Sequence, residues 1–145
     1  MMLWEIVSCK GKELGIILRT EFTAEGIHFF TPGHYSQQLG YMNRPQGYII
    51  KPHIHTPVLR QVSYTKEVLF VKSGRLRVDF YDEDKIYAES RILETGDIIL
   101  LAFGGHGFEM LAPTEIIEVK QGPYAGDRDK SHFNGISADR VVVKP

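Results

Sequence analysis

The sequence predicts an all-β barrel or sandwich, and three observations support this fold class. No long segment repeats apolar residues three and four positions apart, so helices are not expected. Short runs rich in β-branched and aromatic residues recur instead, and turn-forming residues separate them. In one such run Leu76, Val78 and Phe80 alternate with polar residues, which is typical of a strand with one solvated face. Many short strands at this spacing favour a sandwich or barrel over a parallel α/β sheet.

The expected strands follow from these runs and from the turns between them. In chain order we expect strands over residues 3–7, 14–18, 27–30, 47–51, 68–72, 76–81, 98–101, 116–120 and 141–143. Turns are expected at residues 31–34, 72–75 and 82–84, and the turn at Gly74 joins two of these strands into a hairpin. Residues 121–138 are richer in Gly, Asp and Ser, so we expect a long ordered loop or a short helix beside the barrel.

Length and charge limit the possible classes of protein. The 145 residues fit a single domain spanning residues 1–145. Lys and Arg number 17 against 18 Asp and Glu, which argues against nucleic-acid binding, since a phosphate backbone selects clustered positive charge. The longest apolar run, residues 98–103, is too short to span a bilayer, and charges within residues 1–15 interrupt any signal-peptide core. The lone Cys9 fits a reducing compartment, so we expect a cytoplasmic protein.

Two histidines separated by one residue, His53 and His55, are the first candidates for a metal site. On a strand, residues two apart face the same side, so both imidazoles point into one space. Two imidazole nitrogens provide half of a transition-metal coordination shell. Taken alone, the pair fits surface or hydrogen-bonded histidines as well as metal ligands. The spacing of the residues around it therefore decides between these interpretations.

Glycine and glutamate residues around this pair extend the pattern. Gly47 has five residues between it and His53, and Glu67 has six residues between it and Gly74. A later run that begins with glycine reaches His106 after a strand and a tight turn. In these two motifs, over about residues 47–120, the sequence resembles the cupin superfamily. The resemblance implies a double-stranded β-helix (jelly-roll) barrel of cupin type, here with additional amino-terminal strands.

The resemblance also implies four metal ligands, His53, His55, Glu67 and His106. Three neutral imidazoles and one carboxylate bind one divalent ion (manganese, iron, nickel, cobalt or zinc) and leave positions for water or substrate. The eleven residues between His55 and Glu67 exceed the family's usual gap, and Gln61 lies near the usual position. We favour Glu67 over Gln61, because its spacing to the next glycine is the family's and a carboxylate outcompetes an amide for a dication.

The second motif departs from the family's pattern in its turn. Leu101 and Phe103 lie near the places of the usual proline and glycine, and Met110 stands where asparagine is common. These positions shape the turn and are not ligands. The pair at residues 104–105, both glycine, provides a similarly permissive backbone.

Several polar side chains are candidates for the mouth of this site. They are Tyr41, Arg60, Gln61, Tyr64 and Glu109. Glu109 and Tyr64, together with Tyr124, are the candidates for moving a proton in catalysis, although each equally fits a solvated or packing role. Glu109 lies three residues after His106, so on an extended strand it faces the opposite side. The other histidines, at positions 28, 34 and 132, fit no metal spacing.

The resemblance implies a metal-dependent enzyme that acts on a small, oxygen-rich, sugar-like molecule as an isomerase or epimerase, with the ion as Lewis acid. An iron-dependent dioxygenase is a variant of this hypothesis. A non-catalytic binding or sensing cupin is the alternative, because convincing acid and base residues near the ligands are scarce. A structural dimer whose metal only ties strands together is a third. We also expect a homodimer from the resemblance, while the fold alone does not fix the reaction.

Overall fold

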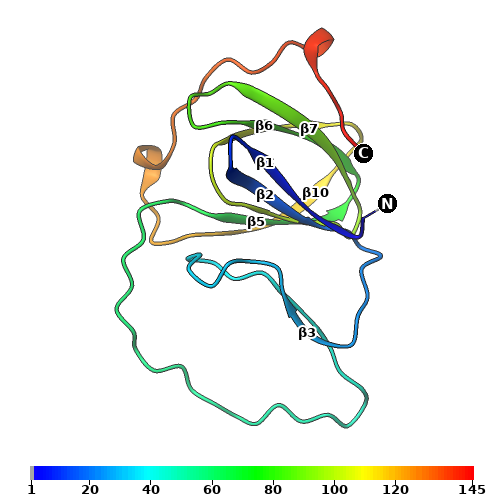
Figure 1. Ribbon diagram of the computed structural model, residues 1–145, viewed down its shortest axis with the longest axis vertical. Helices are drawn as coiled ribbons and strands as arrows, with labels where there is room; N and C mark the ends of the chain where they lie inside the picture. The colour runs from blue at the N-terminus through cyan, green and yellow to red at the C-terminus, as the bar shows by residue number, and fades with distance from the viewer. Residues whose placement is uncertain (1) are drawn as a thin grey trace.

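The computed structural model describes residues 2–145, which form strands and short 3-10 turns (Figure 1). The strands are β1 (Trp4–Cys9), β2 (Lys12–Leu18), β3 (Gly26–Phe29), β4 (Gly40–Asn43), β5 (Glu67–Ser73), β6 (Arg75–Tyr81), β7 (Tyr87–Glu94), β8 (Ile98–Leu101), β9 (Gly105–Met110) and β10 (Glu115–Lys120). The turns are Gly126–Asp129 and Ala138–Arg140. The described chain is therefore all-β, as the sequence predicts. Residues 2–145 include no helical segment with the length and hydrophobicity that a bilayer crossing requires.

The strands form three antiparallel sheets. A five-stranded sheet has the order β1-β2-β8-β5-β10, a three-stranded sheet has the order β7-β6-β9, and β3 pairs with β4 in a hairpin. The two larger sheets pack face to face, because buried residues of β2, β5 and β8 share one apolar cluster with residues of β6 and β7. Phe80, Leu76 and Val78 lie at the centre of this cluster and are fully buried. The alternation seen in the sequence of β6 thus marks its core face.

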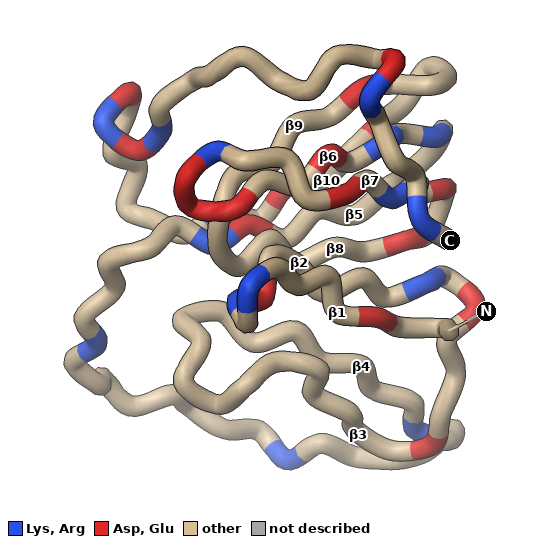
Figure 2. The backbone as a smooth tube through the Cα atoms, turned by 45° about the horizontal axis from the view of Figure 1, so that its top comes forward, with Lys and Arg blue, Asp and Glu red and all other residues tan. Residues whose placement is uncertain are grey.

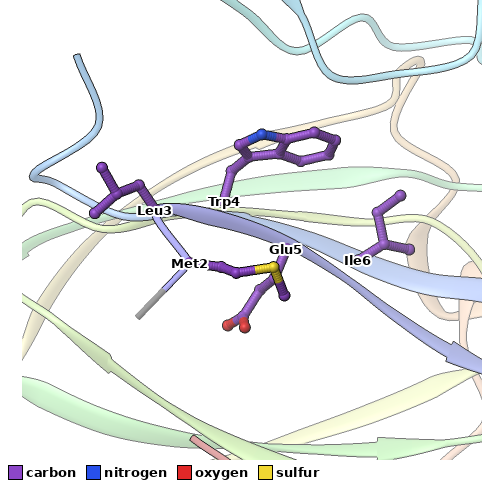
Figure 3. Close-up of a pocket in the computed structure, with 5 residues that line it drawn as sticks. All are labelled: Met2, Leu3, Trp4, Glu5 and Ile6. Atoms are coloured by element: carbon purple, nitrogen blue, oxygen red, sulfur yellow. The ribbon is translucent and has the colours of Figure 1, made fainter.

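The outer face of the five-stranded sheet is apolar as well. Ile16, Leu18 and Leu100 point away from the central core and pack against Phe30 and Leu39 of the β3–β4 region. The hairpin therefore lies on this outer face, below the sheet in Figure 1. At the edge of the same sheet, Trp4 and Ile6 lie on the outer side of β1, whereas Glu5 points the other way (Figure 3).

Glycine is required at the turn between β5 and β6 and at the turn before β9. Gly74 lies between β5 and β6 with φ +99°, and a Cβ there would lie 2.3 Å from the carbonyl oxygen of Pro113. Gly104 precedes β9 with φ +72°, and its Cβ would lie 2.3 Å from the carbonyl oxygen of Tyr81. Left-handed backbone and close approach both exclude larger residues here. The hairpin predicted at Gly74 is confirmed.

The strand predicted over residues 47–51 is wrong. Residues 44–66, which we call the arm, contain no strand and run as an extended loop around the β3–β4 hairpin (Figures 1 and 2). Prolines at positions 45, 52 and 57 each remove a backbone donor, which interrupts pairing along this segment. At the carboxyl end, the predicted strand 141–143 is reduced to a single parallel bridge between Val143 and Ser90.

Three strands, β4, β7 and β9, were not predicted. β7 interrupts its apolar pattern with polar residues that are buried, among them Glu89 and Ser90. Ser90 donates to Asp79 on the neighbouring strand at 2.5 Å, and Glu89 pairs with Arg91 at 2.8 Å. In the sequence, these polar residues suggest a solvent-exposed segment, because their hydrogen-bond partners become apparent only in the folded chain.

Arg19 joins the amino-terminal strands to both large sheets. Its guanidinium contacts Glu5 at 2.7 Å and Asp97 at 3.0 Å, and it donates to the carbonyl oxygen of Ile92 at 2.7 Å. Asp97 also accepts the backbone N–H groups of Thr20 and Glu94. Glu5 and Asp97 are buried, so the two carboxylates depend on this one cation.

We expect Arg19→Met to destabilise the protein by about 3–5 kcal/mol, because it leaves two buried carboxylates without their cation. Urea unfolding at pH 7 measures this change. Arg75→Met is the matched control: its partner Glu94 lies at 3.1 Å, but both side chains are more than half exposed. Its cost should stay below about 1 kcal/mol. Equal losses in the two variants would contradict the assignment.

Candidate metal centre

Glu67 and His106 meet inside the sandwich. Glu67 opens β5 and pairs with Leu101 on β8, on the same face as the core residue Leu69. His106 lies in β9 opposite Phe80 of β6, so its side chain shares the inner face with that buried ring. His106 Nε2 is 3.4 Å from Glu67 Oε2. Two of the four predicted ligands, 39 positions apart in the sequence, are thus neighbours.

The surroundings keep the Glu67 carboxylate ionised. The contact with His106 makes the largest contribution in lowering the pKa of Glu67. Burial raises that pKa, but the electrostatic effects of His106, Lys120 and Lys130 lower it further. The carboxylate is therefore in the form that binds a cation, on a rigid strand and largely shielded from solvent.

His53 and His55 form a second pair, on the arm. Their ring centroids lie 5.2 Å apart, and His53 Nδ1 is 2.9 Å from the carbonyl oxygen of Lys51. Both residues are exposed. The extended backbone thus places the two imidazoles next to each other, but on the arm and not on a strand of the sandwich.

The structure brings the predicted ligands together in two pairs and not in one group. Among residues 2–145, no set of three or more His, Cys, Asp or Glu side chains is arranged to hold a metal ion. The arm lies beyond the β3–β4 hairpin, on the other side of the five-stranded sheet from β9 (Figure 2). The donor types suit a divalent ion, but a single ion held by all four within one copy does not fit this arrangement. Gln61, the alternative to Glu67, lies exposed on the arm.

The candidates for proton transfer are not grouped around Glu67 and His106. Glu109 lies on the outer face of β9, where it pairs with Arg77 at 2.7 Å. Tyr64 is more than half exposed and packs edge-on against Phe103, with ring centroids 5.5 Å apart. Tyr124 is 84% exposed and lies beside Lys120.

The remaining mouth candidates are also spread over the molecule. Arg60 is exposed on the arm, and Tyr41 of β4 packs edge-on against Phe22. A shallow hollow beside β1 is lined by residues 2–6 (Figure 3). Its one carboxylate, Glu5, is bound to Arg19, so the hollow offers apolar contact and no free polar group.

Lys66, the residue before Glu67, is buried in a way that sequence reasoning missed. Its ammonium lies 4.2 Å from the ring centroid of Phe103 and 4.8 Å from that of Tyr35. Burial and the nearby charge of Lys12 lower the pKa of Lys66. Tyr35 in turn donates to Glu13 at 2.5 Å, and burial together with this bond raises the pKa of Tyr35. Nothing in the local sequence separates this lysine from exposed ones.

We expect the stability penalty of Lys66 to depend on pH. Its folded pKa is lowered, so folding disfavours the proton, and stability rises as pH increases through the folded value towards the unfolded value. Lys66→Met lacks this dependence. Its urea midpoint should match or exceed that of the wild type at pH 7, and the difference should shrink towards pH 10.

Lys72→Met is the control for this comparison, because Lys72 is more than half exposed and its partner Glu115, at 3.6 Å, is more than half exposed as well. It should leave the pH dependence of stability unchanged. If the wild type instead loses stability relative to Lys66→Met between pH 7 and pH 10, the pKa of Lys66 is not lowered by folding.

No protein-family model, curated protein or solved structure matches this chain. The chemistry of the site is therefore argued from its own donor atoms and their positions.

Proposed function

We propose that this protein is a metal-binding protein of cupin type that uses a jelly-roll barrel to hold one divalent ion and a small, oxygen-rich molecule. The observation that carries the proposal is the contact between Glu67 and His106 across the inside of the sandwich. The carboxylate of Glu67 and the imidazole of His106, on two rigid strands, are donor types that manganese, iron, nickel, cobalt and zinc bind. When bound, such an ion supplies Lewis-acid chemistry towards adjacent oxygens of a sugar-like molecule.

The chain's own residues have roles that do not depend on the reaction. Glu67 and His106 provide donors on strands fixed by core packing, and Lys120 sits opposite Glu67 on β10, where its charge helps keep the carboxylate ionised. We propose isomerase or epimerase activity on the bound molecule, with iron-dependent oxygen chemistry as the variant. A cytoplasmic homodimer is part of the same proposal.

A second candidate, a binding or sensing protein without turnover, is favoured by the positions of the acid and base candidates. Glu109 is held by Arg77 on the outer face, and Tyr64 and Tyr124 are largely exposed. Among residues 2–145, Glu67 is the one carboxylate or tyrosine that forms a hydrogen bond or ion pair with His106. A site without a proton-transfer group favours binding over catalysis.

We expect protein purified without chelators and without a histidine tag to contain close to one transition-metal ion per chain by elemental analysis. His106→Ala and Glu67→Gln should each lower this content at least tenfold, because each removes a donor from the sandwich. His132→Ala is the matched control: it removes an exposed histidine outside both pairs and should leave the metal content unchanged. A wild-type protein that still contains no metal after incubation with each of these ions in turn would contradict the proposal.

Turnover separates the two candidate functions. If the protein is an enzyme, its metal-loaded form should convert members of a panel of aldoses, ketoses and nucleotide sugars. The reaction is followed in D₂O as exchange of carbon-bound hydrogen for deuterium. A binding protein should show raised thermal stability with the same molecules and no exchange. We expect Glu109→Gln to leave either signal unchanged, because its side chain lies on the outer face.

A further inference from the structure

The β3–β4 hairpin has an apolar face on the side away from the five-stranded sheet. Ile27 and Met42 lie opposite each other in the hairpin, and Phe29 follows Ile27 two residues along the same strand. These side chains are 45%, 51% and 64% exposed, whereas Tyr41 packs against the apolar cluster between the hairpin and the sheet. Residues two apart on a strand share a face, so the hairpin turns one apolar face to the sheet and the other to its surroundings.

The arm adds exposed apolar side chains on the same side of the five-stranded sheet. Ile49, Ile54 and Leu59 are 78%, 87% and 101% exposed relative to the fully accessible value. The arm forms one end of the molecule in Figure 1, below the hairpin. We call residues 26–66, the hairpin together with the arm, the hairpin–arm layer. Exposed apolar surface of this extent normally marks a site of contact with a protein or a membrane.

The hairpin–arm layer contains no acidic residue. Four of the 17 Lys and Arg residues lie within residues 26–66, but none of the 18 Asp and Glu residues does. Glu21 and Glu25 precede the layer, in the connection from β2. The rest of the chain therefore has 13 basic residues against 18 acidic ones. This unequal distribution makes the layer the positive end of the molecule, and it orients the protein in an electric field.

The exposed cations of the layer are free to meet a ligand. Lys51 and Arg60 are exposed on the arm, and among residues 2–145 neither side chain forms a hydrogen bond or an ion pair. Ile54 lies between them in the sequence, and Leu59 directly precedes Arg60. Free positive charge interspersed with exposed apolar side chains is complementary to a surface that is anionic outside and apolar beneath.

An anionic lipid surface fits this combination better than a second copy of the chain or a nucleic acid. A two-fold dimer through this layer would bring two positive ends together, and like charges oppose such an interface. Nucleic acid selects clustered cations, whereas Lys51 and Arg60 are nine positions apart with apolar side chains between them. Tyr48 and Tyr64 are more than half exposed on the arm, and tyrosine suits the boundary between headgroups and acyl chains.

We infer that the hairpin–arm layer is a docking surface for a bilayer that contains anionic phospholipids. Lys51 and Arg60 contact the headgroups, and Ile54 and Leu59 enter the boundary with the acyl chains. The backbone of the arm stays at the depth of the headgroups, because water there satisfies its free N–H and C=O groups and hydrocarbon does not. The inference depends neither on a metal ion nor on the proposed function.

Sedimentation with vesicles tests the inference on the full chain. The protein is mixed with vesicles of phosphatidylcholine alone or with about 30% phosphatidylserine, in the presence of chelator. We expect the partition coefficient to be at least tenfold higher for the vesicles that contain phosphatidylserine, and to fall as salt is added. Equal binding to the two kinds of vesicle, or binding to neither, would overturn the inference.

Variants with the same net charge locate the electrostatic contact. Lys51→Gln/Arg60→Gln should lower the partition coefficient roughly thirtyfold, because both cations lie near the anionic surface. Arg128→Gln/Arg140→Gln is the matched control, since it removes two exposed cations from the 3-10 turns outside the layer. It should change the coefficient by less than about threefold. Equal losses in the two double variants would mean that net charge, and not this surface, determines binding, and would overturn the inference.

A matched pair of isoleucines tests the apolar contact. Ile54→Ser should lower the partition coefficient about tenfold, because it removes a side chain from the acyl boundary. Ile86→Ser makes the same change at an isoleucine that is 59% exposed outside the layer, and it should leave binding unchanged. The urea midpoints of both variants should match that of the wild type, since both side chains are exposed in the free protein.

A fluorescent label reports the position of the arm directly. With Cys9→Ser, a nitrobenzoxadiazole label on Ile54→Cys should shift its emission to the blue when phosphatidylserine vesicles are added. The same label on Ile86→Cys should not shift. Reversal of the two responses would overturn the inference. So would a dimer, detected by light scattering without vesicles, that Ile54→Ser dissociates, because a second copy would then cover this surface.

Discussion

The structure depends on the burial of the inner face of the three-stranded sheet β7-β6-β9. This sheet is narrower than the five-stranded sheet opposite, and the inner face of its edge strand β9 is only partly buried. β6 is central, and its inward side chains Leu76, Val78 and Phe80 are fully buried, because β7 and β9 flank it and the five-stranded sheet lies opposite. Among residues 2–145, β9 has no second neighbour, and its inward side chains Phe108 and Met110 are 38% and 49% exposed. This edge is also where His106 meets Glu67. Incomplete packing and candidate chemistry therefore coincide at one place in the fold.

Local pattern predicted those parts of the fold that local interactions determine. The β5–β6 hairpin followed from Gly74, since no other residue fits its backbone and the carbonyl contact there. The alternation in β6 identified the core face, since a strand packed on one side must alternate. β7 escaped detection because Glu89 and Ser90 are buried with partners that only the folded chain provides.

The arm shows the limit of such reasoning. Residues 47–51 have the apolar composition of a strand, yet a strand exists only where a partner supplies hydrogen bonds. The same limit applies to the metal ligands. The spacing of His53 and His55 predicts two adjacent rings, and the structure has them 5.2 Å apart. Their position relative to Glu67 and His106 depends on where the arm lies, which no spacing along one chain specifies.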